Sequence, residues 1–214
     1  MKEDILEQIV EDWQLSQKGC FVKHNIKYRP DPKSEDYDSK KDSVHSDIDI
    51  LSININDNNK VSVFNCKSWQ EGFNVKYFYE NLMTDPKLTY NKIHGHMTIK
   101  HFREFVIEKW TRAFIEAIVE ETGLNKFTYY VVCTKIINNK NNEKKLFENS
   151  ELIKNIFYSN GGEIDIKIIT LAELLYDYKE RINKKITNYT ESTSVGRLLQ
   201  LIEASDIEIE KLKS

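Results

Sequence analysis

Apolar residues recur along the chain with two different periods, and their succession predicts a mixed α/β fold. Spacings of three and four residues predict helices over 3–16, 102–121, 146–158, 171–184 and about 195–212. Runs rich in β-branched and aromatic residues predict strands over 20–28, 47–53, 61–67, 127–137 and 164–170. This order is typical of a mixed sheet with helices on its faces.

Polar segments divide these elements. Residues 30–46 are rich in Pro and Asp, which predicts a long loop, and the Asn-rich residues 54–60 predict the turn of a hairpin. Residues 187–194 read as a Thr/Ser linker. We therefore expect an α/β domain over 1–186, followed by a linker and C-terminal helix over 187–214. The pattern gives no assignment for residues 70–100.

Composition and charge narrow the class of protein. A hydrophobic fraction of 40% and a charged fraction of 30% are typical of a globular domain and exclude a disordered chain. A net charge of −3 excludes a polycation of the histone type but not a local nucleic-acid site. No apolar run is long enough for a membrane span. Three cysteines without an export signal predict reduced thiols and a cytoplasmic protein.

The predicted hairpin carries the candidate chemistry. Because side chains alternate between the faces of a strand, Asp47 and Asp49 share one face, and Asn65 and Lys67 share a face of the next strand. If the hairpin pairs symmetrically about Asn58, Asp49 lies directly opposite Lys67, with Cβ atoms about 5 Å apart. A slip of one residue would place the two on opposite faces.

Such a patch suits a hard divalent cation. Mg²⁺ prefers oxygen ligands and usually takes one or two protein carboxylates. Asp49 would supply one carboxylate, and the backbone carbonyl of Cys66 would supply a further oxygen. Water bound to a metal has a lowered pKa and attacks phosphodiesters, and Lys67 would orient that water or stabilise charge on the phosphate. The ordinary alternative is a cross-strand ion pair between Asp49 and Lys67.

The residues of this hairpin resemble a known family. The segments Asp47-Ile48-Asp49-Ile50-Leu51 and Val63-Phe64-Asn65-Cys66-Lys67-Ser68-Trp69 look like the motif of the PD-(D/E)xK nuclease superfamily. The likeness extends over about residues 3–170, from the leading helix to the last strand. It implies a restriction-endonuclease-like mixed sheet with flanking helices, here with an extra C-terminal helix, and DNA hydrolysis with Mg²⁺ or Mn²⁺.

One position departs from the family pattern. Asn65 stands where the second acidic residue is expected, so it keeps an oxygen ligand but lacks a negative charge. Asp47 is a candidate for the additional metal-binding carboxylate. So is Glu7 on the leading helix, with Glu11 one turn later as its alternative and Gln70 as a weaker candidate. Asp49, Asn65 and Lys67 are the expected catalytic residues.

These features predict a Mg²⁺-dependent nuclease that hydrolyses phosphodiester bonds, a DNA endonuclease of the restriction or defence type, with RNA as an open alternative. Lys92, Lys100 and Arg103, in a basic run with interleaved aromatics, are the expected phosphate contacts. The alternative without a functional role is that this basic run forms the solvent-exposed face of a helix. A homodimer would cut both strands, and the last helix offers an apolar stripe for it, formed by Val195, Leu198, Leu199 and Ile202.

Two other functions stay open. A catalytically weak or inactive nuclease-fold module that binds nucleic acid or a protein partner would explain Asn65. A structural interaction protein would have no nucleic-acid role. Zinc is disfavoured, because His94, His96 and His101 have no cysteine pair beside them. Trp69 and Phe73, after the hairpin, are expected to be core residues.

Overall fold

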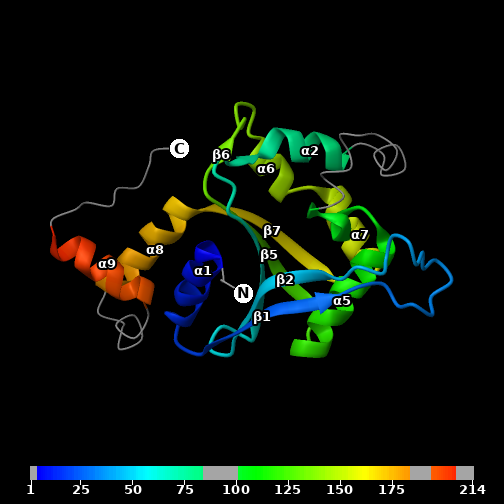
Figure 1. Cartoon of the computed structure of the whole chain (residues 1–214), viewed down its shortest axis with the longest axis horizontal. Helices are drawn as coiled ribbons and strands as arrows, with labels where there is room; N and C mark the ends of the chain where they lie inside the picture. Colours follow the sequence, from blue (N-terminus) through cyan, green and yellow to red (C-terminus); the bar gives the residue numbers. More distant parts are fainter. Residues whose placement is uncertain (1–3, 84–100, 184–193, 206–214) are drawn as a thin grey trace.

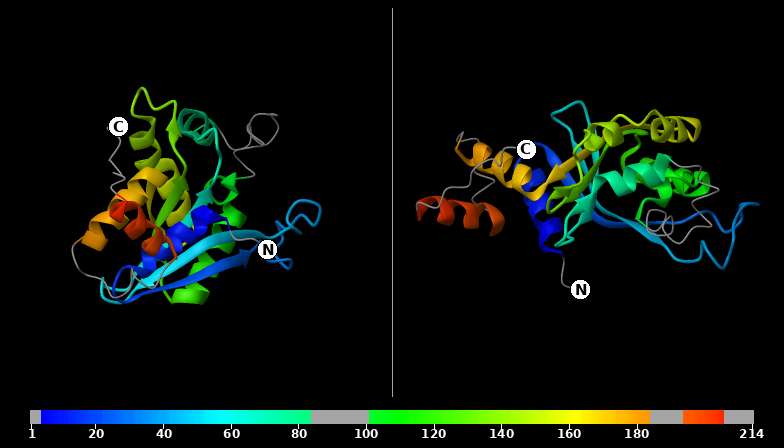
Figure 2. Two further views of the ribbon diagram at one scale, coloured as in Figure 1. Left: turned by 60° about the vertical axis from the view of Figure 1, so that its left-hand side comes forward. Right: turned by 90° about the horizontal axis from the view of Figure 1, so that it is seen from above.

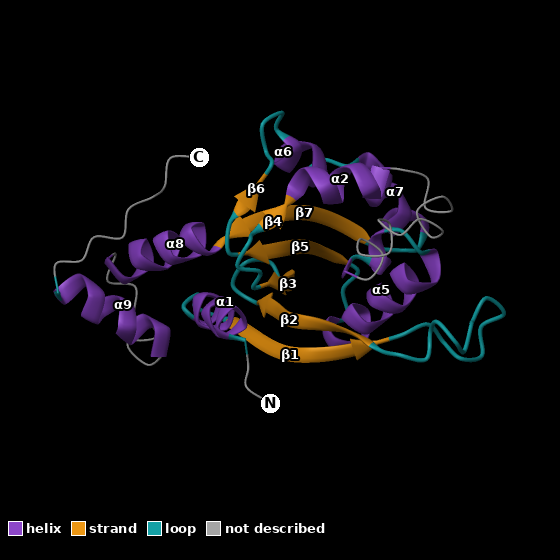
Figure 3. Cartoon of the chain, turned by 45° about the horizontal axis from the view of Figure 1, so that its top comes forward, coloured by secondary structure: helices purple, strands orange, loops and turns teal. Residues whose placement is uncertain are grey.

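The computed structural model describes residues 4–83, 101–183 and 194–205. Within them, five strands form one mixed sheet in the order β1-β2-β3-β5-β7 (Figure 3). Their bounds are β1 Cys20–Tyr28, β2 Ser46–Asn54, β3 Lys60–Lys67, β5 Lys126–Cys133 and β7 Glu163–Thr170. The first three strands pair antiparallel, while β5 pairs parallel with both β3 and β7. The predicted α/β class and the position of the hairpin are confirmed.

Helices cover both faces of this sheet (Figures 1 and 2). On one face lie α1 (Ile5–Leu15), α8 (Leu171–Asn183) and α9 (Ser194–Ala204). On the other lie α2 (Val75–Met83), α5 (Glu108–Thr122), α6 (Glu143–Glu148) and α7 (Glu151–Ser159). Each side has its own apolar core, so the sheet is buried between two layers of helices.

Aromatic side chains fill the two cores unequally. The core under α1 is small, with Phe64 stacked on Tyr130 at a centroid distance of 4.8 Å and Trp13 against both rings. The core under α5 is larger. There Phe73 is fully buried and Trp69 stacks near it, so the prediction that these two residues belong to the core is confirmed.

Three predicted elements have different bounds. The helix expected over 102–121 begins as a single 3-10 turn, Arg103–Phe105, before α5, because Ile107 is extended and interrupts it. The strand expected over 127–137 ends at Cys133, and a short strand β6 (Ile136–Ile137) pairs with β4 (Phe73–Asn74) in a second sheet. The helix expected over 146–158 divides into α6 and α7 at Ser150, whose hydroxyl caps α7.

The C-terminal helix packs against its own chain. Leu199 is buried beside α1 and α8, whereas Leu198 is 56% exposed, so part of the stripe expected at a dimer interface is used within the protomer. The linker expected over 187–194 lies almost wholly outside the described residues, as does the end of the helix beyond 205. The homodimer stays a prediction. Among the described residues, no helix has the length and apolarity of a membrane span.

The loop between β1 and β2 projects beyond the sheet (Figure 1) and is fixed at its base. The buried Asp42 carboxylate accepts hydrogen bonds from Lys109 Nζ at 2.6 Å and from Trp110 Nε1 at 3.2 Å, both on α5. Charge-assisted bonds of this kind are the stronger ones. They hold the chain that leads into β2, where the candidate site begins.

Candidate active site

The hairpin register differs from the expected one. The ladder between β2 and β3 runs from Asn54↔Lys60 to Ile50↔Phe64, so it is centred on Asp57 and not on Asn58. The expectation that Asp49 lies directly opposite Lys67 is therefore wrong. The difference is two residues along the partner strand, and because the side-chain period is also two, the shift leaves Asn65 and Lys67 on the face expected for them. The Asn-rich turn, with Asn58 and Asn59 in the left-handed region, sets this register.

Asp49 lies where the alternation of side chains between the two faces of the sheet is interrupted, so that residues two apart in the strand point to opposite faces. His24 faces α1, where it contacts Glu11, whereas Ile26 belongs to the core under α5. In the same way, Ile50 and Ile48 belong to opposite cores. The change coincides with Asn25, which has a φ of 53° in the left-handed region that Asn tolerates. The ladder of β1 and β2 omits the position between these pairs, which is that of Asp49.

The Asp49 side chain takes over a hydrogen bond of the hairpin. The β2–β3 ladder stops at Ile50↔Phe64, and beyond it the Cys66 N–H donates to Asp49 Oδ2 at 2.5 Å. Burial raises the pKa of this carboxyl to about 6, although Lys67 and the Cys66 N–H both lower it and Asp47 raises it further. Asp49 is thus anchored at the end of β3 with its charge only partly compensated.

Five of the predicted site residues line one cavity of about 210 Å³. The side chains of Asp47, Asp49, Asn65, Lys67 and Arg103 all line it. The remaining lining residues come from β1, from the loop before β2 and the first residue of β2, and from the segment before α5: Tyr28, His45, Ser46, His101 and Glu104. With three carboxylates against two permanent cations, the wall has a net negative charge when the histidines are neutral. It therefore favours a cation over a bare phosphate.

Two side chains of β3 complete the pattern. Lys67 places its Nζ 5.9 Å from the centroid of the Phe102 ring, so its ammonium lies beside that ring at the cavity. Asn65 Oδ1 is buried and receives no hydrogen bond from the described residues. A buried oxygen without a donor is costly unless a ligand satisfies it. Asn65 therefore offers the cavity an oxygen that no described donor satisfies.

Of the two candidate carboxylates on α1, Glu7 is the one near Asp49. Burial raises its pKa to about 7, and the charges of Asp49 and Asp4 raise it further. Glu11 instead forms an ion pair with His24 Nε2 at 3.0 Å. Glu7 is not among the residues that line the cavity. It faces Asp49 from the α1 side of the sheet.

The predicted phosphate contacts are only partly described. The Arg103 guanidinium lies 4.2 Å from the centroid of the Trp110 ring, at the cavity wall. Lys92 and Lys100 fall in 84–100, outside the described residues. Gln70 is exposed and does not line the cavity.

Glu104 is a site residue that the sequence did not single out. It is 2% exposed, and its Oε1 and Oε2 accept hydrogen bonds from Tyr129 Oη at 2.7 Å and Tyr28 Oη at 3.2 Å. Burial raises the pKa of this carboxyl, and the Tyr129 hydroxyl lowers it. In the sequence Glu104 follows Arg103 at the start of an apparent amphipathic helix, where a glutamate is typical. Its neighbours Phe102 and Phe105, both fully buried, were the available signal.

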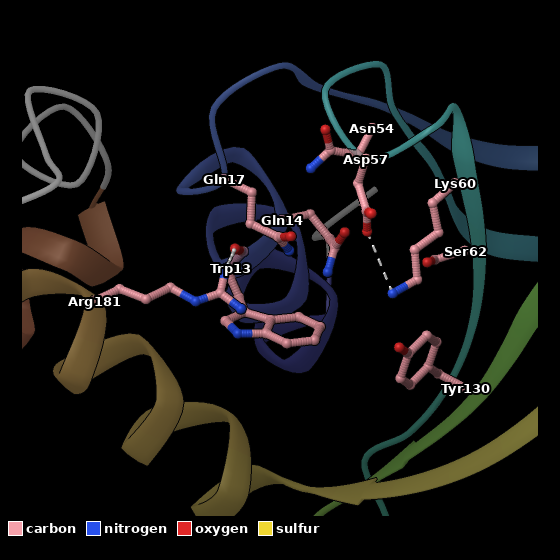
Figure 4. Close-up of a pocket in the computed structure, with 9 residues that line it drawn as sticks. All are labelled: Trp13, Gln14, Gln17, Asn54, Asp57, Lys60, Ser62, Tyr130 and Arg181. Carbon is pink, nitrogen blue, oxygen red and sulfur yellow. Dashed lines mark hydrogen bonds and ion pairs between the residues drawn. The ribbon is translucent and has the colours of Figure 1, made fainter.

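A second cavity lies on the other face of the sheet, between α1, α8 and the hairpin turn (Figure 4). It is smaller, about 110 Å³, and its cations are already neutralised. Arg181 is 2.5 Å from Asp177, and Lys60 is 3.6 Å from Asp57. Arg181 also donates to the Trp13 carbonyl at the end of α1, so its role there is structural. The cavity around Asp49 is the better candidate.

Comparison with known proteins gives no further assignment. No family model, no curated protein and no solved structure matches the chain. Within residues 4–83, 101–183 and 194–205, no cluster of three or more His, Cys, Asp or Glu side chains is arranged to hold a metal ion. The candidate oxygen ligands at the cavity are instead mixed: the carboxylates of Asp47, Asp49 and Glu104 and the amide of Asn65.

Proposed function

We propose that this protein is a Mg²⁺- or Mn²⁺-dependent nuclease of the restriction-endonuclease-like fold, acting on DNA as an endonuclease. One observation carries the proposal. Asp49, Asn65 and Lys67, with the spacing of the PD-(D/E)xK motif, line a single cavity that is otherwise rich in carboxylates. The order of the strands also agrees with this reading, with an antiparallel hairpin followed by a parallel strand that pairs with its second member.

The donor set fits a hard divalent cation. Asp49 and Asn65 Oδ1 offer oxygens at the end of β3, and the Cys66 carbonyl lies between Asn65 and Lys67 in the chain. Such ions take few protein carboxylates and keep several waters, so a mixed set suffices. A bound Mg²⁺ would supply a Lewis acid and a water of lowered pKa. Its charge would also reverse the sign of the cavity wall, which then attracts phosphate.

The other residues have separate tasks in the proposed reaction. Lys67 positions the attacking water or neutralises charge that develops on the scissile phosphate. Asp49 is ionised above its pKa of about 6, so its metal-binding form prevails at neutral pH and above. Arg103, whose guanidinium lies over the Trp110 ring, binds a phosphate that flanks the scissile one.

Cleavage of supercoiled plasmid tests the proposal. The wild-type chain is incubated with the plasmid in Mg²⁺, in Mn²⁺ and in EDTA, with matched single-stranded DNA and RNA in parallel. Nicked or linear DNA with metal and intact plasmid in EDTA is the expected result. Cleavage of RNA in place of DNA would change the proposed substrate to RNA and support the metal-dependent phosphodiester hydrolysis. Failure to cut any of these substrates with either metal would contradict the nuclease proposal.

A second candidate function is a nuclease-fold module that binds nucleic acid without cutting it. Asn65 favours this reading, because the missing negative charge weakens a divalent site. The two candidates differ in their response to metal. A nuclease is stabilised thermally by Mn²⁺ and cuts, whereas the binding module retains DNA in a gel shift in EDTA and shows no change of melting temperature with Mn²⁺.

Replacement of Arg103 by glutamine is expected to weaken DNA binding equally for all sequences. One lost phosphate contact lowers the slope of log affinity against log salt by about one. Titration of a fluorescent duplex at several salt concentrations, in Ca²⁺ or EDTA, measures both quantities. Arg112→Gln is the matched control, since Arg112 is exposed on α5 and pairs with Asp36 at 2.9 Å. An equal loss in both variants would mean that Arg103 contributes only general charge.

A further inference from the structure

The cavity holds a carboxylate that the hairpin motif does not explain. Glu104 comes from the 3-10 turn before α5, about forty positions after Asn65 in the chain, yet both line the cavity. Glutamate is almost never fully buried unless it is paired or binds a ligand. Among the described residues Glu104 forms no ion pair, and its carboxylate accepts hydrogen bonds from two neutral tyrosine hydroxyls and from its own backbone N–H.

Two strands fix the orientation of this carboxylate. Tyr28 from β1 donates to one of its oxygens and Tyr129 from β5 donates to the other. Both tyrosines are themselves buried, at 5% and 0% exposure, so the carboxylate has little freedom. Hydrogen bonds that hold a carboxylate in this way are typical of the support around a metal ligand.

The charges around Glu104 connect it to the candidate motif. Lys67 lowers its pKa, and the charge of Glu104 in turn raises the pKa of Asp49. It therefore lies within electrostatic range of both motif residues. Two negative groups in a shared buried cavity repel each other, and a cation bound between them removes that repulsion.

We infer that Glu104 supplies the second carboxylate of the metal site, the ligand that Asn65 does not provide. The inference rests on the proposed function and identifies which acid completes its site. Asp47 is a weaker candidate because it is exposed on β2. Glu7 is weaker because it lies on α1 and does not line the cavity. Glu104 is the acid that is both buried at the cavity and held in place.

Metal affinity measured without substrate tests the inference. Binding of Mn²⁺ is followed by the EPR signal of the free ion and by thermal shift, in wild type, Glu104→Gln, Asp49→Asn and Glu116→Gln. Glu116 is an exposed glutamate of α5 and serves as the matched control. Glu104→Gln is expected to weaken Mn²⁺ binding about tenfold or more, while Glu116→Gln leaves it unchanged.

A variant that moves the carboxylate from position 104 to position 65 distinguishes a metal-binding role of Glu104 from a structural one. If Glu104 is a ligand, Asn65→Asp in the Glu104→Gln background restores Mn²⁺ affinity to within about threefold of wild type. In EDTA, Glu104→Gln then melts no lower than wild type, because it removes a buried charge. Unchanged affinity in Glu104→Gln, or a loss that Asn65→Asp does not rescue, would overturn the inference.

The remaining outcomes are also decisive. If wild type binds Mn²⁺ no better than Asp49→Asn, the proposed metal-dependent function fails, and the role of Glu104 fails with it. If Glu104→Gln does not fold, Tyr28→Phe and Tyr129→Phe replace it, since each keeps the carboxylate and removes one orienting bond. Weaker Mn²⁺ binding in both supports the inference, and wild-type affinity in both contradicts it.

Discussion

Replacement of Asp49 by asparagine or of Lys67 by methionine is expected to lower the rate of metal-dependent DNA cleavage by about a hundred- to a thousandfold. Asparagine keeps the shape of Asp49 and an acceptor for the Cys66 N–H, but it removes the charge that holds the cation. Methionine keeps an unbranched apolar side chain at position 67 and removes the ammonium that lies beside Phe102. Both variants therefore test charge at the cavity and leave the surrounding packing in place.

The same sheet supplies a matched pair of controls. Asp165 and Lys167 share the exposed face of the edge strand β7 and lie outside the cavity. Asp165→Asn and Lys167→Met are expected to cut at the wild-type rate. Plasmid nicking at several enzyme concentrations measures all four variants. Full activity in Asp49→Asn or Lys67→Met would show that the hairpin is not the active site.

The hairpin could be read from the sequence because its signals are local. Alternation along the apolar run that ends at Lys67 places Asn65 and Lys67 on one face, and both line the cavity. Alternation over 47–51 fails, because Ile48 and Ile50 lie in opposite cores, although Asp47 and Asp49 both line the cavity. The register could not be predicted, because the turn over 54–60, in which only Ile55 is apolar, fits more than one pairing. A shift of two residues changes the partner of Asp49 without moving it from the cavity.

Two features of the cavity depend on contacts that are distant in the chain. The interrupted alternation of side chains at Asn25 places Tyr28 beneath α5, where its hydroxyl donates to Glu104. The periodicity of the sequence does not predict a single left-handed residue inside a strand. In the sequence, Glu104 has the position expected of a residue on the polar face of an amphipathic helix. Its burial becomes visible only when β1, β5 and the turn before α5 are brought together.

Asp49→Asn is also expected to stabilise the protein when metal is absent. The carboxyl has a pKa of about 6 in the folded state against an ordinary value of 3.8, because burial opposes its charge more than Lys67 and the Cys66 N–H support it. Each pKa unit corresponds to about 1.4 kcal/mol. At pH 8 in EDTA, the variant should therefore be about 2–3 kcal/mol more stable towards urea than wild type.

The size of this effect changes with pH in a defined window. Since the folded state holds the proton of Asp49 more tightly than the unfolded state, wild type is favoured at low pH and loses this contribution as pH rises from about 4 to about 6. The advantage of Asp49→Asn should accordingly vanish below pH 4 and reach its full size above pH 6 to 7. Asp165→Asn, on the exposed edge strand, should show no such window.

Added metal should reverse the order of stability at pH 8. Mn²⁺ raises the free energy of unfolding of wild type, because it binds the folded state and offsets the buried negative charge, whereas Asp49→Asn gains little. Urea titrations at pH 8 and below pH 4, each in EDTA and in Mn²⁺, measure all of these differences. If Asp49→Asn is less stable than wild type in EDTA at both pH values, the carboxylate serves to hold the end of β3. A stabilised variant that also fails to cut would instead show that Asp49 is retained at a cost in stability, as expected of a residue that binds a cation.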